Sequence, residues 1–159
     1  MNDWLMLAFG LALTVGTGIF VASEFSMLNL ERNEIEARAE RGEKGLSSTI
    51  RALKRTATHL SGAQLGITLT TMLTGFLAEP ALSHMLESSV SPVFALVLTM
   101  FITTLFSTLF GELVPKKLAL TLPLEVNRFV VNFQLAFTLV FSWMIAILNA
   151  AGNGIVRAM

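Results

Sequence analysis

The sequence contains no cysteine and only two histidines. Without cysteine the chain cannot form a disulfide framework, a thiolate metal site or a cysteine nucleophile. Charged residues are also scarce, because they make up 14% of the 159 positions, whereas about 25% is usual for globular chains. Eleven Lys and Arg balance eleven Asp and Glu, so bulk charge gives no indication of nucleic-acid binding, and none is expected.

Apolar residues are abundant instead. They account for 53% of the chain, and the mean hydropathy is +0.68, which excludes a disordered chain and argues against a water-soluble fold. Four segments are nearly free of charge: residues 4–23, 56–78, 88–111 and 129–156. Because about 20 apolar residues in a helix cross the hydrocarbon layer, we predict an all-α integral membrane protein whose first partner is the lipid bilayer.

The N-terminal apolar segment is interpreted as a retained span. A secretory signal peptide begins with basic residues and has a shorter apolar core. Here Asp3 precedes the segment, no Lys or Arg does, and the apolar run continues to Leu30 with only Glu24 inside it.

Charge placement predicts the orientation. Residues 31–58 hold twelve of the 22 charged side chains, including seven Lys or Arg, and such basic loops lie in the cytoplasm. We therefore expect a multi-pass protein of the plasma membrane, with its N-terminus outside and residues 31–58 cytoplasmic. The connection at 79–92 has no Lys or Arg, which fits the outside.

The basic segment itself has helical apolar spacing on either side of a turn at Gly42–Gly45. It is either a solvated linker or a helix along the membrane surface with basic residues near the headgroups, and we favour the second. The fold class expected is thus three to four transmembrane or re-entrant helices plus a cytoplasmic juxtamembrane amphipathic belt. Residues 1–159 would form one such domain, with spans at 4–30, 60–88 and 92–120, the belt at 31–58, and a fourth hydrophobic segment at 127–151 that need not be a simple span.

Two acids fall within apolar segments, where a carboxylate is costly and generally faces a cavity or a partner. Glu112 follows Gly111 and precedes Pro115. Since Pro115 has no amide hydrogen, a carbonyl near Gly111 loses its partner, and a free carbonyl beside a carboxylate outlines a hard-oxygen cation site. The alternative is a simple helix end with lysines reaching the headgroups.

The other acid, Glu24, lies between Ser23 and Ser26. It either pairs with a backbone amide or a basic residue, or contributes to cation binding. The second apolar segment supplies neutral oxygens on one helix face, at Gln64, Thr68 and Thr71. These side chains either line a wet cavity or join helices through hydrogen bonds.

Three segments together resemble the transmembrane domain of the CorC/cyclin M (CNNM) family of magnesium exporters: GIFVASEFSMLNLERNEIE, HLSGAQLGITLTTMLTGFLAEPAL and FGELVPKKLAL. The resemblance covers essentially residues 4 to 150. It implies a homodimer, cytosolic CBS domains that normally follow this domain but are absent from the 159 residues, and magnesium as the transported substrate with no organic cofactor. On this ground the chain is expected to be part of a longer protein.

The resemblance also assigns metal ligands. The acidic ligand of the GELVPK-type motif falls on Glu112, with Thr71 and Ser23 as further ligands and Glu24, Ser26, Thr68, Gln64 and Gly111 as weaker candidates. Many members have Asn where this chain has Thr71, and Ser where it has Val21. The expected function is magnesium efflux coupled to another ion; the alternative is a non-transporting scaffold or regulatory partner. No motif of an enzyme is present, so no enzymatic activity is expected.

Overall fold

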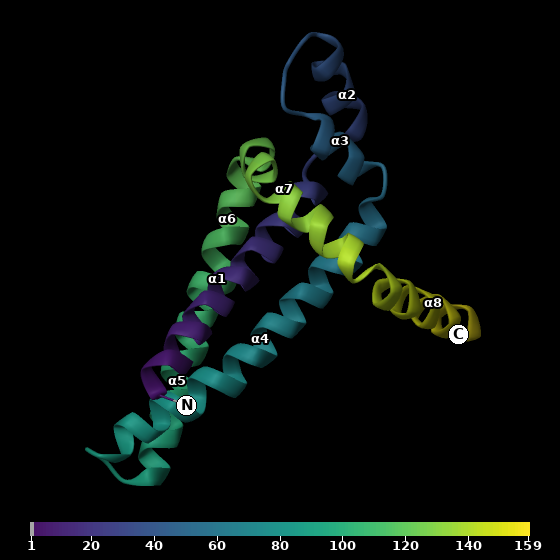
Figure 1. Cartoon of the computed structure of the whole chain (residues 1–159). Coiled ribbons are helices and arrows are strands. Elements are labelled where there is room, and N and C mark those ends of the chain that lie inside the picture. Colours follow the sequence, from purple (N-terminus) through teal and green to yellow (C-terminus); the bar gives the residue numbers. More distant parts are fainter. Residues whose placement is uncertain (1) are drawn as a thin grey trace. The chain divides into compact units, whose positions relative to one another are not determined.

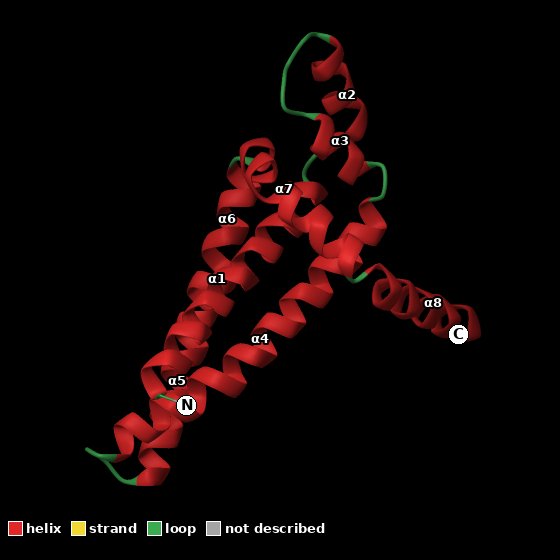
Figure 2. Ribbon diagram, viewed as in Figure 1, coloured by secondary structure: helices red, strands yellow, loops and turns green. Residues whose placement is uncertain are grey.

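The structure is a computed structural model that describes residues 2–159, and every regular element within that range is helical (Figures 1 and 2). The elements are α1 (Asp3–Leu28), α2 (Arg32–Glu40), α3 (Ser47–Leu53), α4 (Thr56–Glu87), α5 (Pro92–Phe106), the π-helix η1 (Ser107–Leu113), α6 (Val114–Thr121), α7 (Pro123–Val140) and α8 (Ser142–Ala158). The predicted all-α fold is confirmed.

Three stretches are long and apolar enough to cross a membrane: α1, α4, and the continuous run Pro92–Thr121 formed by α5, η1 and α6. Helices α7 and α8 reach that length only as a pair, and they bend by 79° at the break between them. The number of candidate spans is therefore three, or four if the bent pair is one span. Glu79, which the charge pattern placed in an outer connection, lies inside α4.

The chain forms two compact units. The first unit contains the chain up to Ile19 and Gly66–Pro115, and the second contains Phe20–Leu65 and Lys116–Met159. In the first unit α1 packs closely on α4 at Gly10, where an added Cβ would lie only 2.7 Å from the Ala78 Cβ. Small residues allow membrane helices to approach in this way, since packing rather than hydrophobic exclusion holds them together.

The second unit has a core built from the end of α1, the basic segment and α7. Six buried residues form it: Met27, Ile35, Leu46, Ala52, Leu53 and Val131. Gly42 and Gly45 have φ angles of +92° and +79°, a conformation that favours glycine, and they reverse the chain between α2 and α3. The apolar face of this belt is covered by protein at Ile35, Leu46 and Leu53.

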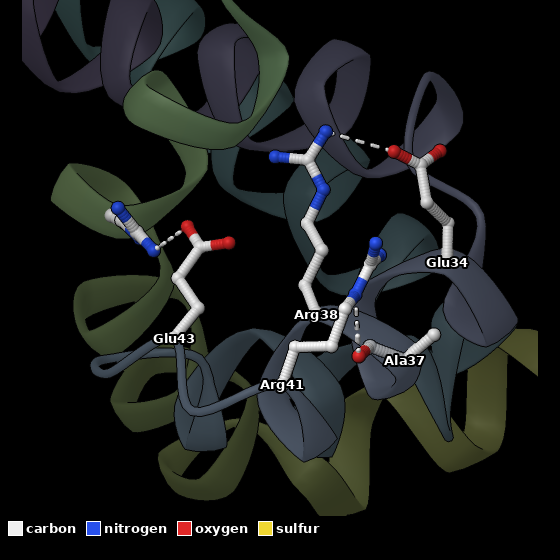
Figure 3. A network of polar contacts seen from close by, with 6 residues as sticks. Glu34, Ala37, Arg38, Arg41 and Glu43 are labelled. Carbon is white, nitrogen blue, oxygen red and sulfur yellow. Dashed lines mark hydrogen bonds and ion pairs between the residues drawn. The ribbon is translucent and has the colours of Figure 1, made fainter.

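The polar side of the belt is held by ion pairs (Figure 3). The Arg38 guanidinium donates to the Glu34 carboxylate at 2.9 Å, one helical turn away. Glu43, in the loop after α2, accepts a hydrogen bond of 2.6 Å from Arg128 of α7. The same Arg128 also donates to the Lys44 carbonyl at 3.2 Å, so the loop is tied to α7 by two bonds.

Candidate functional site

The GELVPK segment lies at the C-terminal end of a π-helix. Residues Ser107–Leu113 form η1, which includes Gly111 and Glu112. Pro115 lacks an amide hydrogen and its ring crowds the preceding turn, and a π-helical turn is one way in which a helix accommodates such a defect. The amide of Val114 accordingly donates to Leu109, five residues back. The helix therefore continues through Pro115 instead of ending there.

This hydrogen-bond pattern leaves the carbonyl of Phe110 without its usual donors. Val114, four residues on, donates to Leu109 instead, and Pro115, five residues on, has no amide hydrogen. The freed carbonyl thus belongs to Phe110, the residue directly before Gly111. It faces α1 at Gly18, where an added Cβ would lie 3.3 Å from the Phe110 oxygen and 3.0 Å from Pro115 Cγ.

Two threonines of α1 lie beside η1, and one of them is bonded to α4. An added Cβ at Gly111 would be 3.6 Å from the methyl carbons of both Thr14 and Thr17. Thr17 Oγ1 and Thr70 Oγ1 are 2.7 Å apart and share a hydrogen bond. Thr14, Thr17 and Thr70 were not among the predicted ligands, although Thr14 and Thr17 lie three residues apart, and Thr17 directly precedes Gly18.

The predicted ligands divide between the two units. The first unit holds Thr68, Thr71, Gly111 and Glu112, and the second holds Ser23, Glu24, Ser26 and Gln64. Gly111 is buried, whereas Thr71 and Glu112 are exposed. Within residues 2–159, Glu112 has no ion pair and no side-chain hydrogen bond, so its carboxylate is open to a ligand.

In the second unit Glu24 already has partners in the protein. Its carboxylate accepts a hydrogen bond from the Gln64 side chain, and Lys116 acts on it electrostatically. The Lys116 ammonium also lies 4.5 Å from the centre of the Phe25 ring, a cation–π distance. These contacts favour the interpretation in which Glu24 is paired within the protein.

The two serines that flank Glu24 are both fully buried. Ser26 donates to the Ser23 carbonyl at 3.0 Å and accepts from the Asn127 amide at 3.1 Å. The Ser23 hydroxyl has no hydrogen-bond partner in the described part of the chain. Val21 is an apolar core residue with 2% of its surface exposed.

No group of three or more His, Asp or Glu side chains is close enough to hold a metal ion within the described residues. A cation bound at η1 would therefore have one carboxylate and would otherwise depend on neutral carbonyl, hydroxyl and water oxygens. That donor set suits hard cations, and it excludes the sulfur and imidazole chemistry that transition metals prefer.

These helices and the polar segment within them define a multi-pass, all-helical membrane domain. Residues 8–159 match the family of the cyclin M transmembrane N-terminal domain (CNNM). The chain belongs to that family, as the three motifs predicted.

Two bacterial proteins are similar to part of this chain. The UPF0053 protein MT1890 of Mycobacterium tuberculosis is 49% identical over 75 residues, which are 47% of this chain and 16% of that protein. The UPF0053 protein YhdT of Bacillus subtilis is 36% identical over 77 residues, or 48% and 17% of the two chains. The match thus spans about a sixth of the length of each of these relatives.

Proposed function

We propose that this domain moves hard cations across the membrane, with magnesium efflux coupled to a second ion as its main activity. The observation that carries the proposal is η1, where an unpaired carbonyl at Phe110 lies within one turn of the unpaired carboxylate of Glu112. A carboxylate beside a broken or distorted membrane helix is a common form of ion site. Thr71, in the same unit, is proposed as a further oxygen donor.

The chemistry of magnesium limits how such a site works. Magnesium requires nearly octahedral oxygen ligands at about 2.0–2.1 Å and gives up its water reluctantly. One carboxylate with neutral oxygens compensates only half of its charge, so the ion would keep several of its waters. Weak binding of this kind suits transport, since an ion that is carried must also be released.

We further propose a homodimer in the plasma membrane, with the N-terminus outside, the belt at 31–58 in the cytoplasm, and cytosolic CBS domains after this domain in the full-length protein. The large exposed apolar side chains of α5, such as Val93 and Phe101, support this arrangement because lipid or a second copy would cover them. No catalytic role is proposed.

Magnesium-dependent thermal stability tests the site. A ligand that binds only the folded state raises the melting temperature, so we expect a saturable rise with magnesium for the detergent-purified wild type. Calcium and sodium serve as ion controls. Glu112→Gln should abolish the rise while leaving the melting temperature in ion-free buffer nearly unchanged.

The matched control is Glu125→Gln, which removes another exposed acid outside η1 and should keep the magnesium response. Magnesium flux into or out of proteoliposomes, measured with an entrapped indicator, then tests transport itself. A response that survives Glu112→Gln would contradict the assignment of Glu112 as a ligand.

The second candidate is a non-transporting scaffold with a degenerate site. Val21 favours it, because a buried valine replaces the hydroxyl that many relatives have. A scaffold predicts no magnesium-dependent stabilisation and no flux in the wild type, and full tolerance of Glu112→Gln.

A further inference from the structure

A cavity lies in the first unit, between α4 and the run of α5 and η1. Its volume is about 200 Å³. All of its lining residues except Gly75 have side chains that end in oxygen or carry a hydroxyl group: Thr71, Thr74, Glu79, Thr103, Thr104, Ser107 and Thr108. A cavity with this lining within membrane helices holds water or an ion more readily than it holds lipid, because each uncompensated polar group in hydrocarbon is costly.

Several of these side chains have no partner in the protein. Serine and threonine in membrane helices commonly donate to the carbonyl one turn back, as Thr74 does to Thr70 at 2.8 Å. Among residues 2–159 no such hydrogen bond forms for four hydroxyl groups of the cavity, those of Thr71, Thr104, Ser107 and Thr108. Those oxygens remain available as ligands.

Glu79 is the only acid that lines this cavity. It is partly buried, and it has no ion pair or hydrogen bond with any described residue. The first unit contains no lysine or arginine at all, so no basic side chain of that unit can compensate the charge. Its one histidine, His84, is already bonded to Asp3 at 2.9 Å. A proton, water or a cation must therefore stabilise the Glu79 carboxylate.

Glu79 also connects this cavity to a second one. Together with Gly75 it lines a neighbouring cavity of about 600 Å³ near the end of α4, which includes Asp3, His84 and Glu87. At its other end the hydroxyl-lined cavity reaches Ser107, whose Oγ lies 3.7 Å from the position of an added Cβ at Gly111. Oxygen-bearing side chains thus run from the end of α4 to the candidate site in η1.

We propose that Glu79 binds a hard cation at the junction of these two cavities, as a second ion site on the route between η1 and the end of α4 near Asp3. The inference builds on the proposed transport function, but it concerns a different carboxylate. One carboxylate with neutral hydroxyl oxygens carries a charge of minus one, which balances the charge of sodium fully and half of the charge of magnesium. The shared chemistry is an oxygen-seeking cation, and the two ions are separate arms of the test.

The test is protection of individual carboxyl groups from a hydrophobic carbodiimide, followed by digestion and mass spectrometry. Wild type and Glu112→Gln are labelled in ion-free buffer and then with sodium or magnesium. At ten times the dissociation constant about one site in ten stays free, so labelling of Glu79 should fall about tenfold in both proteins. Glu125, an exposed acid that lines neither of the two cavities, is the internal control and should not respond.

The outcomes separate this inference from the proposed function. Protection of Glu112 without protection of Glu79 would overturn the second site and leave the first. Protection of Glu79 alone would support the second site and remove Glu112 as a ligand. Protection of neither acid, or no labelling of Glu79 even without ions, would overturn the inference. Protection by only one of the two ions would identify which cation Glu79 binds.

Discussion

Alanine substitutions at three glycines of α1 test how closely the first unit packs around η1. An added Cβ would lie 2.7 Å from the Ala78 Cβ at Gly10 and 3.0 Å from Pro115 Cγ at Gly18. At Gly16 it would lie 3.5 Å from a methyl group of Thr70, which is an ordinary contact. The structure therefore predicts a graded series in which Gly10→Ala is the most harmful and Gly16→Ala is harmless.

The magnitudes follow from two opposing effects. Alanine is favoured over glycine in a helix by about 0.8–1.0 kcal/mol, and this gain is common to the three variants. Overpacking costs about 1–3 kcal/mol, and it applies to Gly10 and Gly18 but not to Gly16. The difference in stability between each of these two variants and Gly16→Ala therefore measures the overpacking alone. For a chain of this size 1 kcal/mol corresponds to about 2–4 °C, so the two tight variants should melt about 2–12 °C below Gly16→Ala.

Thermal melting of the detergent-purified variants measures the series, and repeating it with magnesium adds a second readout. Gly18→Ala presses on Pro115 and on the Phe110 carbonyl, so it should also reduce the magnesium-dependent rise in melting temperature. Gly10→Ala, which is remote from η1 along α1, should keep that rise. Equal melting temperatures for all three variants would refute the close approach of α1 to α4 and η1.

Three further substitutions test other contacts by the same melting assay. Thr17→Val removes the hydrogen bond to Thr70 and should lower the free energy of unfolding by about 0.6 kcal/mol, the average for such bonds in membranes. The control Thr17→Ser keeps the hydroxyl group, so an equal or larger loss of stability in that variant would contradict the assignment. Leu46→Ala leaves a cavity in the core of the second unit and should lower the free energy of unfolding by about 2–5 kcal/mol. An unchanged free energy of unfolding would mean that the belt does not pack on the rest of that unit. Glu43→Gln breaks the pair with Arg128 and should cost at most about 1 kcal/mol, a difference that should shrink in 1 M salt.

The membrane class and the helical fold could be predicted because both depend on local properties. Long uncharged segments specify spans wherever they occur in a chain. The turn of the belt was equally local, because Gly42 and Gly45 adopt the positive φ angles that other residues avoid. The family and the position of the candidate site could be predicted from the motifs, since the acid and the proline of GELVPK are close together in sequence.

Features that depend on contacts between distant segments could not be predicted. Thr17 and Thr70 are 53 residues apart, and no periodicity in the sequence pairs them. The apolar spacing of the belt identified a buried face, but it did not show that α7 and the end of α1 would cover it. Glu79 was assigned to a connection because it ends the uncharged segment 56–78, although α4 continues eight residues beyond it to Glu87.

Pro115 separates a functional interpretation of η1 from a purely structural one. Pro115→Ala supplies an amide hydrogen that can pair with the carbonyl of Phe110 or Gly111, and alanine is favoured over proline inside a helix by about 3 kcal/mol. The lost contact with Gly18 offsets part of this gain, so the melting temperature in ion-free buffer should stay equal or rise.

If the free carbonyl serves only to accommodate the proline, magnesium should stabilise the Pro115→Ala variant as much as the wild type. If Phe110 helps to bind the cation, pairing its carbonyl removes a ligand, and the magnesium response should weaken while the fold becomes more stable. A stabilised variant with a lost response would be difficult to explain by structural damage, because damage lowers both quantities together. A stabilised variant with an unchanged response would remove Phe110 from the site and leave Glu112 to bind the ion with hydroxyl and water oxygens alone.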